Sequence, residues 1–384
     1  MGFVSLGCLV WGMHPIQWHF PRLCDKNIMV APVVSPEALA ALQSDFADLV
    51  DQLSTAKNGA LILEALSTLV HIARTGTDRL DWKILVGSLH DMQQAFSVFY
   101  PYRHTRKIAI FGSARTPETA PEYGMAHDVA ECMMHQGFMV MTGAGGGIMA
   151  AANQGAGREA SFGLNVQLPF EQEANPHIKG DPKLLQFKYF FTRKLFFLRE
   201  TDGVVVFPGG FGTLDEAFEC LTLIQTGKFG PAPVVLVDHP QGTYWKAWDH
   251  YVREQLIRQH FISAADPSIY TITDRLDVAC QSIARFYRVY HSSRYVGDRF
   301  VMRLTTELAD ADLELLNHQF ADLVTQDKIR KSPALPAEIG SETEHLPRLV
   351  FHFNQRATGR LYQFINTIND LASVTVPPAS PGTK

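Results

Sequence analysis

The sequence predicts an α/β fold in which a doubly wound parallel sheet carries a helical N-terminal region and a small C-terminal α+β appendage. Three observations support this. Apolar residues recur at helical spacing before residue 100, short apolar runs then alternate with amphipathic segments, and strand-like and helix-like segments mix near the end. At 384 residues the chain is too long for one ordinary domain, and we expect regions at 1–100, 101–290 and 291–384.

The first region is expected to be an extended arm followed by helices. Ser35 before Pro36 is typical of a helix start, while Asn58-Gly59 and the segment 76–78 indicate breaks between helices. The opening 20 residues lack the basic start and cleavage site of a secretory signal. Their apolar run is shorter than the roughly 20 residues that span a bilayer, so we expect no membrane partner. An extended arm and a later start at Met29 both stay open.

The central region shows continuous apolar runs, which are typical of parallel strands covered on both faces. These runs are Ile108 to Phe111, Phe138 to Met141, Leu164 to Leu168, Val204 to Phe207, Val234 to Val237 and Tyr270 to Ile272. Helices are expected to begin near Pro121, Gly147, Thr192, Thr213, Tyr244 and Asp274. Right-handed crossovers would bring the C-terminal strand ends to one rim, where ligands of Rossmann-like sheets bind.

The last region combines strand-like runs at 300–304 and 349–353 with helical patterns at 310–323 and 358–371. The segment 332–347 is rich in Pro, Gly and charge, so it is expected to be a loop. The end of the chain, from Pro377 to Gly382, is expected to be disordered.

Composition excludes several classes of function. A net charge of -5 and a pI near 6.3 give no general attraction to nucleic acid. The five cysteines (Cys8, Cys24, Cys132, Cys220 and Cys280) lie far apart without metal-ligand spacing, which indicates reduced thiols and a cytoplasmic protein. The histidines form no HExxH pattern, so we expect no metal site. No arrangement supports pyridoxal-phosphate chemistry, and we expect no cofactor.

The most informative segment is Val204 to Glu216, an apolar strand followed by a glycine-rich turn and a helix. Such a turn exposes backbone N–H groups at a helix N-terminus, where partial positive charge favours a phosphate. Gly209, Gly210 and Gly212 remove the side chains that would block its approach. An alternative stays open, because Thr213 with Glu216 also fits a capping box. Taken alone, that capping pattern is the commoner explanation.

A second glycine-rich turn, Thr142 to Met149, follows the strand that ends at Met141. It is neither a dinucleotide fingerprint, since Ile148 stands where glycine is needed, nor a P-loop. A tight strand-to-helix connection would explain its glycines equally well. Two such turns on one rim favour a nucleotide pocket.

The motifs together resemble the LONELY GUY (LOG) family, often labelled lysine decarboxylases, whose members are phosphoribohydrolases. They are PGGxGTxxE at Pro208 to Glu216, an Arg-Lys pair at 193–194, GSAR at 112–115, and the glycine turn at 142–156. The resemblance covers about 106–238, and the extra regions on both sides resemble the long bacterial branch that includes nucleotide 5′-monophosphate nucleosidases. Family members commonly carry glutamate where this chain has Ala150, which puts the substrate range in question.

The resemblance implies hydrolysis of the N-glycosidic bond of nucleoside 5′-monophosphates, with Arg193 and Glu216 catalytic. It also implies a homodimer or higher homo-oligomer. The residues expected to contact phosphate or sugar are Ser113, Gly143, Gly145, Gly146, Gly209, Gly210, Gly212 and Thr213. A nucleotide sensor without catalysis and a carrier of a phosphorylated cofactor such as molybdopterin are the alternatives. The preferred base, the role of both flanks and any effector stay open.

Overall fold

The computed structural model describes residues 48, 50–53, 55–167, 173–371 and 382. The chain divides into two compact units, Met1–Asp78 and Arg79–Lys384. In the first unit, α2 (Gly59–Arg74) begins after Asn58, whose φ of 65° is left-handed, and Gly76 follows it at φ 73°. Both predicted helix breaks are therefore confirmed. The arm, the helix start at Ser35 and residues 377–381 of the end expected to be disordered lie outside the described residues. At Gly382 that expectation is wrong, because this residue is buried, its carbonyl accepts from the Arg106 N–H and its N–H donates to the Gln136 carbonyl.

The second unit begins with α3 (Arg79–Phe99), which packs against the parallel sheet domain. We expected the helical region to extend to residue 100, whereas the structure divides the chain before α3. Among the helices of the described residues, none has both the length and the hydrophobicity that crossing a membrane requires.

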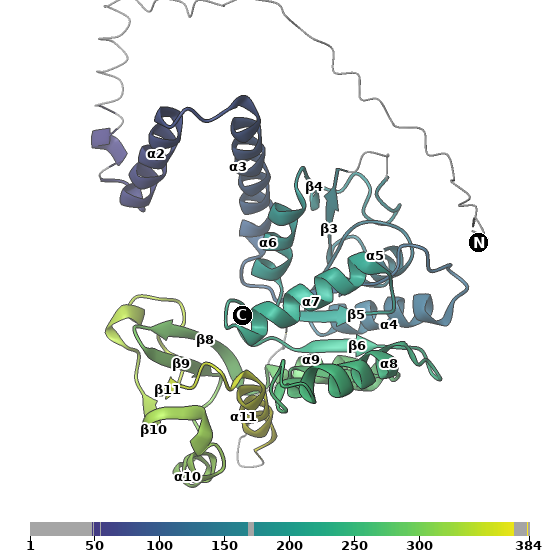
Figure 1. Ribbon diagram of the computed structural model, residues 1–384, viewed down its shortest axis with the longest axis vertical. Helices are drawn as coiled ribbons and strands as arrows, with labels where there is room; N and C mark the ends of the chain where they lie inside the picture. The colour runs from purple at the N-terminus through teal and green to yellow at the C-terminus, as the bar shows by residue number, and fades with distance from the viewer. Residues whose placement is uncertain (1–47, 49, 54, 168–172, 372–381, 383–384) are drawn as a thin grey trace, which may run out of the picture. The chain divides into compact units, whose positions relative to one another are not determined.

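The core of this unit is a parallel sheet, as predicted, and it has seven strands where six were expected (Figure 1). Its strands are β1 (Lys107–Phe111), β2 (Met139–Thr142), β3 (Ser161–Val166), β4 (Leu184–Phe187), β5 (Gly203–Val206), β6 (Val234–Val237) and β7 (Tyr270–Thr273). Their order is β4-β3-β2-β1-β5-β6-β7. The chain therefore winds away from β1 in one direction and from β5 in the other, which makes the gap above these two strands the switch point of the sheet.

Helices flank the sheet and begin within two residues of their predicted starts. They are α4 (Pro121–His135), α5 (Ile148–Ala156), α6 (Phe190–Glu200), α7 (Phe211–Gln225), α8 (Tyr244–Tyr251) and α9 (Leu276–Phe286). α4 packs against both α5 and α9, so these three share one layer. α6 packs against α3, β3 and β4.

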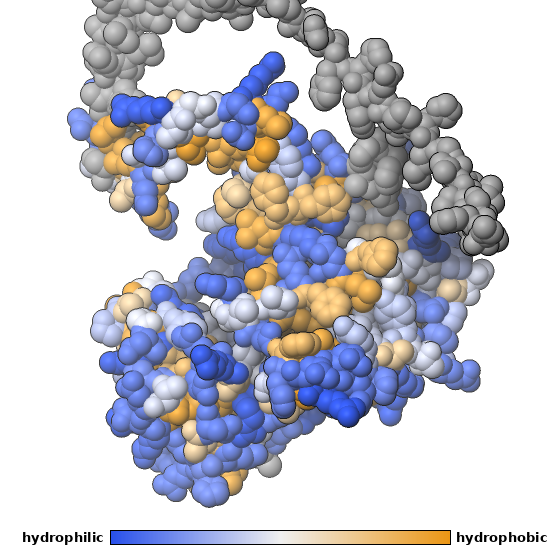
Figure 2. Space-filling view, viewed as in Figure 1, coloured by the Kyte–Doolittle hydropathy of each residue, from blue (hydrophilic) through white to orange (hydrophobic). Residues whose placement is uncertain are grey.

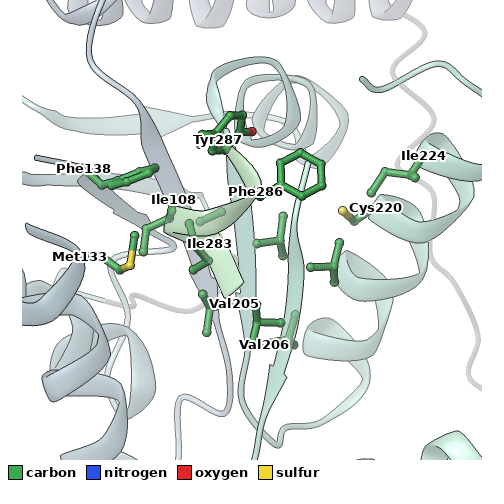
Figure 3. Packing of buried hydrophobic residues seen from close by; sticks show 14 of the residues in the cluster. Ile108, Met133, Phe138, Val205, Val206, Cys220, Ile224, Ile283, Phe286 and Tyr287 are labelled. Carbon is green, nitrogen blue, oxygen red and sulfur yellow. The ribbon is translucent and has the colours of Figure 1, made fainter. Parts of the chain in front are cut away.

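The hydrophobic core lies between the central strands and these helices. Ile108 of β1 and Val205 of β5 pack with Met133 of α4 and Ile283 of α9, and none of the four is exposed (Figure 3). Burial of such a side chain contributes about 1.5–3 kcal/mol to the free energy of unfolding. This rigid centre holds the strand ends that carry the glycine turns.

The C-terminal region adds an antiparallel sheet in the order β10-β11-β9-β8. Its strands are β8 (Tyr290–Val296), β9 (Arg299–Leu304), β10 (Val324–Ser332) and β11 (Arg348–Phe353), accompanied by α10 (Asp310–Gln319) and α11 (Thr358–Asp370). The predicted runs at 300–304 and 349–353 are β9 and β11. β8 and β10 were not predicted, nor was the edge strand β4.

α11 ties this region to the parallel sheet domain. The Tyr362 hydroxyl accepts a hydrogen bond from the Ala232 N–H and donates one to the Ala232 carbonyl. The Asn369 side chain accepts from the N–H groups of Val289 and Tyr290 and donates to the Phe286 carbonyl. The appendage therefore shares one compact unit with the sheet.

Candidate functional site

Three loops meet at the C-terminal ends of β1, β2 and β5. The Ser113 N–H donates to the Pro208 carbonyl and the Ser113 carbonyl accepts from the Ile148 N–H, both at 3.1 Å. Gly147 has φ 58°, and a side chain there would place Cβ 2.3 Å from the Ser113 carbonyl oxygen. The loop after β1 is thus clamped between the two glycine turns.

The turn after β5 leads into the N-terminus of α7. A Cβ on Gly209 would lie 2.2 Å from Thr213 Oγ1, so packing requires this glycine. At Gly210 and Gly212 an added Cβ would meet no atom within 4 Å. Protein packing therefore does not explain these two glycines, whereas the close approach of a ligand would. The first helical bond of α7 runs from the Leu214 N–H to the Gly210 carbonyl. The N–H groups before Leu214 therefore have no partner within the helix, and they lie beside the space left by the two glycines.

The capping-box alternative for Thr213 and Glu216 is wrong. The N-cap of α7 is Gly210, and no side chain caps this helix end. Glu216 lies beyond the first turn and instead accepts a hydrogen bond from Arg193 Nη2 at 3.0 Å. The carboxylate thus faces the Arg193 guanidinium of α6.

Arg193 and Glu216 form a charged pair in a largely dry environment. Their side chains are 14% and 8% exposed. Burial raises the pKa of the Glu216 carboxyl above its usual range, and it outweighs Arg193 and Lys194, which lower that pKa. Arg193 Nε is buried and has no hydrogen-bond partner among the described residues.

Lys194, the second residue of the Arg-Lys pair, has a different role. Its ammonium lies 2.7 Å from both Asp215 and Glu219 of α7. Burial disfavours its charge, but the bonds to these two carboxylates outweigh that effect and raise the pKa of Lys194. Lys194 therefore fastens α6 to α7, while Arg193 faces the cleft.

The loops and helices enclose a cleft of about 550 Å³, a size typical of small-molecule sites. Its lining comprises Phe111, Gly112, Ser113, Ala114, Arg115, Gly143, Met149, Arg193, Phe197, Gly210, Phe211, Gly212, Thr213 and Glu216. The lining combines apolar and aromatic side chains with the glycine turns and the charged pair.

Most predicted site residues line this cleft together. They are Ser113, Gly143, Arg193, Gly210, Gly212, Thr213 and Glu216. Gly145, Gly146 and Gly209 are not in its lining. The Gly145 carbonyl accepts from Asn175 Nδ2, and Gly146 lies against the Ala114 carbonyl, so both support the turn from behind.

Sequence reasoning missed several lining residues. Arg115 belongs to the GSAR motif and brings a second cation to the cleft. Met149, Phe197 and Phe211 add apolar surface. Each lies next to a recognised motif, and that proximity was the available signal. Ala150, which replaces the common glutamate, is buried and does not line the cleft.

Comparisons with known proteins agree with these motifs. Residues 148–283, which include Arg193 and Glu216, match the family model described as "Possible lysine decarboxylase". No curated protein matches the chain.

Solved structures match slightly less than half of the chain at low similarity. TM1055, a structural genomics target, is 22% identical over 46% of this chain and 96% of its own, with a TM-score of 0.33. The molybdenum cofactor binding protein from Rippkaea orientalis is 16% identical over 46% of this chain and 93% of its own, with a TM-score of 0.33. The molybdenum cofactor carrier protein from Chlamydomonas reinhardtii is 19% identical over 47% and 96%, with a TM-score of 0.32. These likenesses are too weak to carry a functional argument. Motifs and family model together place a domain of the LOG family, the possible lysine decarboxylases, in this chain.

Proposed function

We propose that this protein hydrolyses the N-glycosidic bond of nucleoside 5′-monophosphates, releasing the free base and ribose 5-phosphate. The observation that carries the proposal is the buried Arg193–Glu216 pair, which faces the same cleft as an open helix N-terminus. The cleft thus offers N–H groups that suit an anion and a carboxylate that suits a developing cation.

The phosphate is assigned to the N-terminus of α7. Backbone N–H groups and the helix dipole favour an anion there by about 0.3–1 kcal/mol or more. Gly210 and Gly212 leave room for it. Ser113 and Arg115 line the same cleft and offer a hydroxyl and a cation.

The carboxylate of Glu216 is assigned to the sugar. Cleavage between C1′ and the base nitrogen builds positive charge on the ribose, which a carboxylate stabilises. Water supplies a hydroxyl to C1′ and a proton to the departing base. Arg193 lines the same cleft, where its guanidinium holds a phosphate or ribose oxygen and fixes the sugar beside Glu216.

A carrier or a sensor of phosphorylated ligands would not need this carboxylate. Burial raises the pKa of Glu216, so keeping its carboxylate charged here costs free energy. Such a cost is typical of a group that acts in the reaction rather than in ground-state binding.

We further propose that the protein forms a homodimer through the surface around the cleft mouth. Large apolar side chains are exposed on α6 and α7: Phe190, Phe191, Leu195, Phe211 and Phe218. Phe211 is 94% exposed although it lines the cleft. Figure 2 shows hydrophobic surface over α3 and α6. Symmetric pairing of two such patches would cover them and enclose the cleft.

The test is incubation of the purified protein with a panel of purine and pyrimidine nucleoside 5′-monophosphates, with release of ribose 5-phosphate as the readout. The matching nucleosides without phosphate serve as the comparison. We expect turnover of at least one nucleotide and little turnover of its nucleoside. Equal turnover of both would contradict the phosphate assignment, and no release from any nucleotide would contradict the hydrolase.

A further inference from the structure

The N-terminus of α6 lacks a capping side chain of its own. Its N-cap is Tyr189, which makes no side-chain bond to the helix end. Asp91 of α3, about a hundred residues earlier, instead binds both the segment that leads into α6 and its first turn. Its carboxylate accepts from the N–H of Lys188 at 3.1 Å, the N–H of Tyr189 at 3.3 Å and the hydroxyl of Thr192 at 2.5 Å.

Asp91 is 6% exposed, so these bonds are largely shielded from water. A carboxylate at a helix N-terminus also interacts favourably with the helix dipole. Charge-assisted bonds of this kind are roughly twice as strong as neutral ones. The carboxylate therefore holds the first turn of α6 from outside the helix.

Gly87 brings α3 close enough for this contact. It lies one turn before Asp91, and a Cβ there would lie 2.9 Å from Tyr189 Cε2 and 3.0 Å from Lys188 Cδ. The Tyr189 hydroxyl donates to the Lys83 carbonyl on the same helix. Glycine inside a helix costs about 1 kcal/mol relative to alanine, and here the close approach explains its presence.

Aromatic contacts hold the rest of α6 against α3. Phe196 of α6 meets Phe96 edge-on with ring centroids 5.3 Å apart, and it stacks near Phe99 at 6.2 Å. Figure 1 shows α3 and α6 side by side. α3 thus controls both the position of α6 and the order of its first turn.

Arg193 immediately follows Thr192, which Asp91 binds, and it belongs to this first turn. We propose that Asp91 is a positioning residue that holds the first turn of α6 so that the Arg193 guanidinium meets Glu216 and the substrate. This inference rests on the proposed hydrolase function. It assigns a role in the site to α3, which lies outside the residues that match the family.

The experiment compares Asp91→Ala and Asp91→Asn with Asp266→Ala in the full-length protein. Asp266 is a matched control because it is equally buried, at 6%, and accepts from one backbone N–H and one side chain, those of Ser263 and Gln225. Neither of these bonds reaches α6. Loss of stability alone lowers the active fraction and hence kcat, but it leaves KM unchanged.

In Asp91→Ala we expect amide hydrogen exchange at residues 188–193 to accelerate about tenfold, with little change in α7. We expect kcat to fall about 10- to 100-fold, because small misplacements of a catalytic group cost rates of this size. KM should rise as well, since Arg193 also holds the ground state. Asp91→Asn keeps one acceptor and should lie between Asp91→Ala and the wild type. Asp266→Ala should leave KM and α6 exchange unchanged.

A double-mutant cycle with Arg193→Ala separates positioning from other effects. If Asp91 acts through Arg193, Asp91→Ala causes little further loss of kcat/KM when Arg193 is already alanine. Full additivity, or exchange at 188–193 no faster than in Asp266→Ala, overturns the inference. Hydrogen exchange does not depend on turnover. A wild type without hydrolase activity would therefore refute the proposed function, and the exchange rates would still show whether Asp91 holds α6.

Discussion

Replacing Glu216 by glutamine removes the negative charge while keeping the shape of the side chain. The carboxylate is 8% exposed, so water has little access to it and cannot readily replace the lost charge. Removing one such transition-state contact lowers kcat by about 10²- to 10³-fold, which corresponds to about 2.7–4 kcal/mol.

The fold should tolerate this change. Arg193 Nη2 donates to Glu216 over 3.0 Å in the wild type. Glutamine can still accept this hydrogen bond, but its side chain is neutral. The difference between a charged and a neutral acceptor is about 1 kcal/mol of unfolding free energy. Glu216→Gln should therefore be folded, bind nucleotide and be nearly inactive.

Glu219→Gln is the matched control, because Glu219 lies one turn further along α7, pairs with Lys194 and does not line the cleft. Ribose 5-phosphate release, thermal unfolding and calorimetric nucleotide binding are measured for both variants. Near-normal turnover in Glu216→Gln, or an equal loss in Glu219→Gln, would refute the assignment of catalysis to Glu216.

Three further predictions concern pH, assembly and packing. Because burial raises the pKa of Glu216, turnover should be lost as pH falls through a value above that of an ordinary carboxyl; a kcat profile with its acid limb at or below the usual range would contradict this. Phe191→Glu with Leu195→Glu should convert dimers to monomers in light scattering, and a wild type that is already monomeric at micromolar concentration would exclude the dimer. Gly87→Ala should lower the melting temperature despite better helix propensity, whereas Gly124→Ala, where an added Cβ meets nothing within 4 Å, should not lower it.

The sequence predicted the elements whose patterns reflect burial. Strands such as Val234–Val237 are buried on both faces, so their apolar runs are continuous. β4 was missed because this four-residue edge strand includes an exposed Gln186. β8 and β10 were missed because Tyr290–Val296 and Val324–Ser332 consist largely of polar residues.

The candidate site was predictable to a similar extent. Glycine motifs indicated the rim, and the resemblance singled out Arg193 and Glu216 across 23 residues of sequence. Spacing alone favoured a helix cap for Glu216, because a capping box and a buried ion pair use the same residue types. Asp91 carried no signal, since a lone acid in a helical pattern is usually a solvated residue. Only the packing of α3 on α6 reveals its partners.

The bonds made by α11 determine where this chain can be shortened. A protein ending at Asn354 would keep all seven parallel strands and all four antiparallel ones. It would nevertheless expose both backbone groups of Ala232, the N–H groups of Val289 and Tyr290, and the carbonyl of Phe286, all of which α11 satisfies. It would also uncover the apolar side chains beneath Phe364, Ile365 and Ile368, which are fully buried. α11 is therefore part of the sheet domain, and a shortened protein should include residues through Asp370.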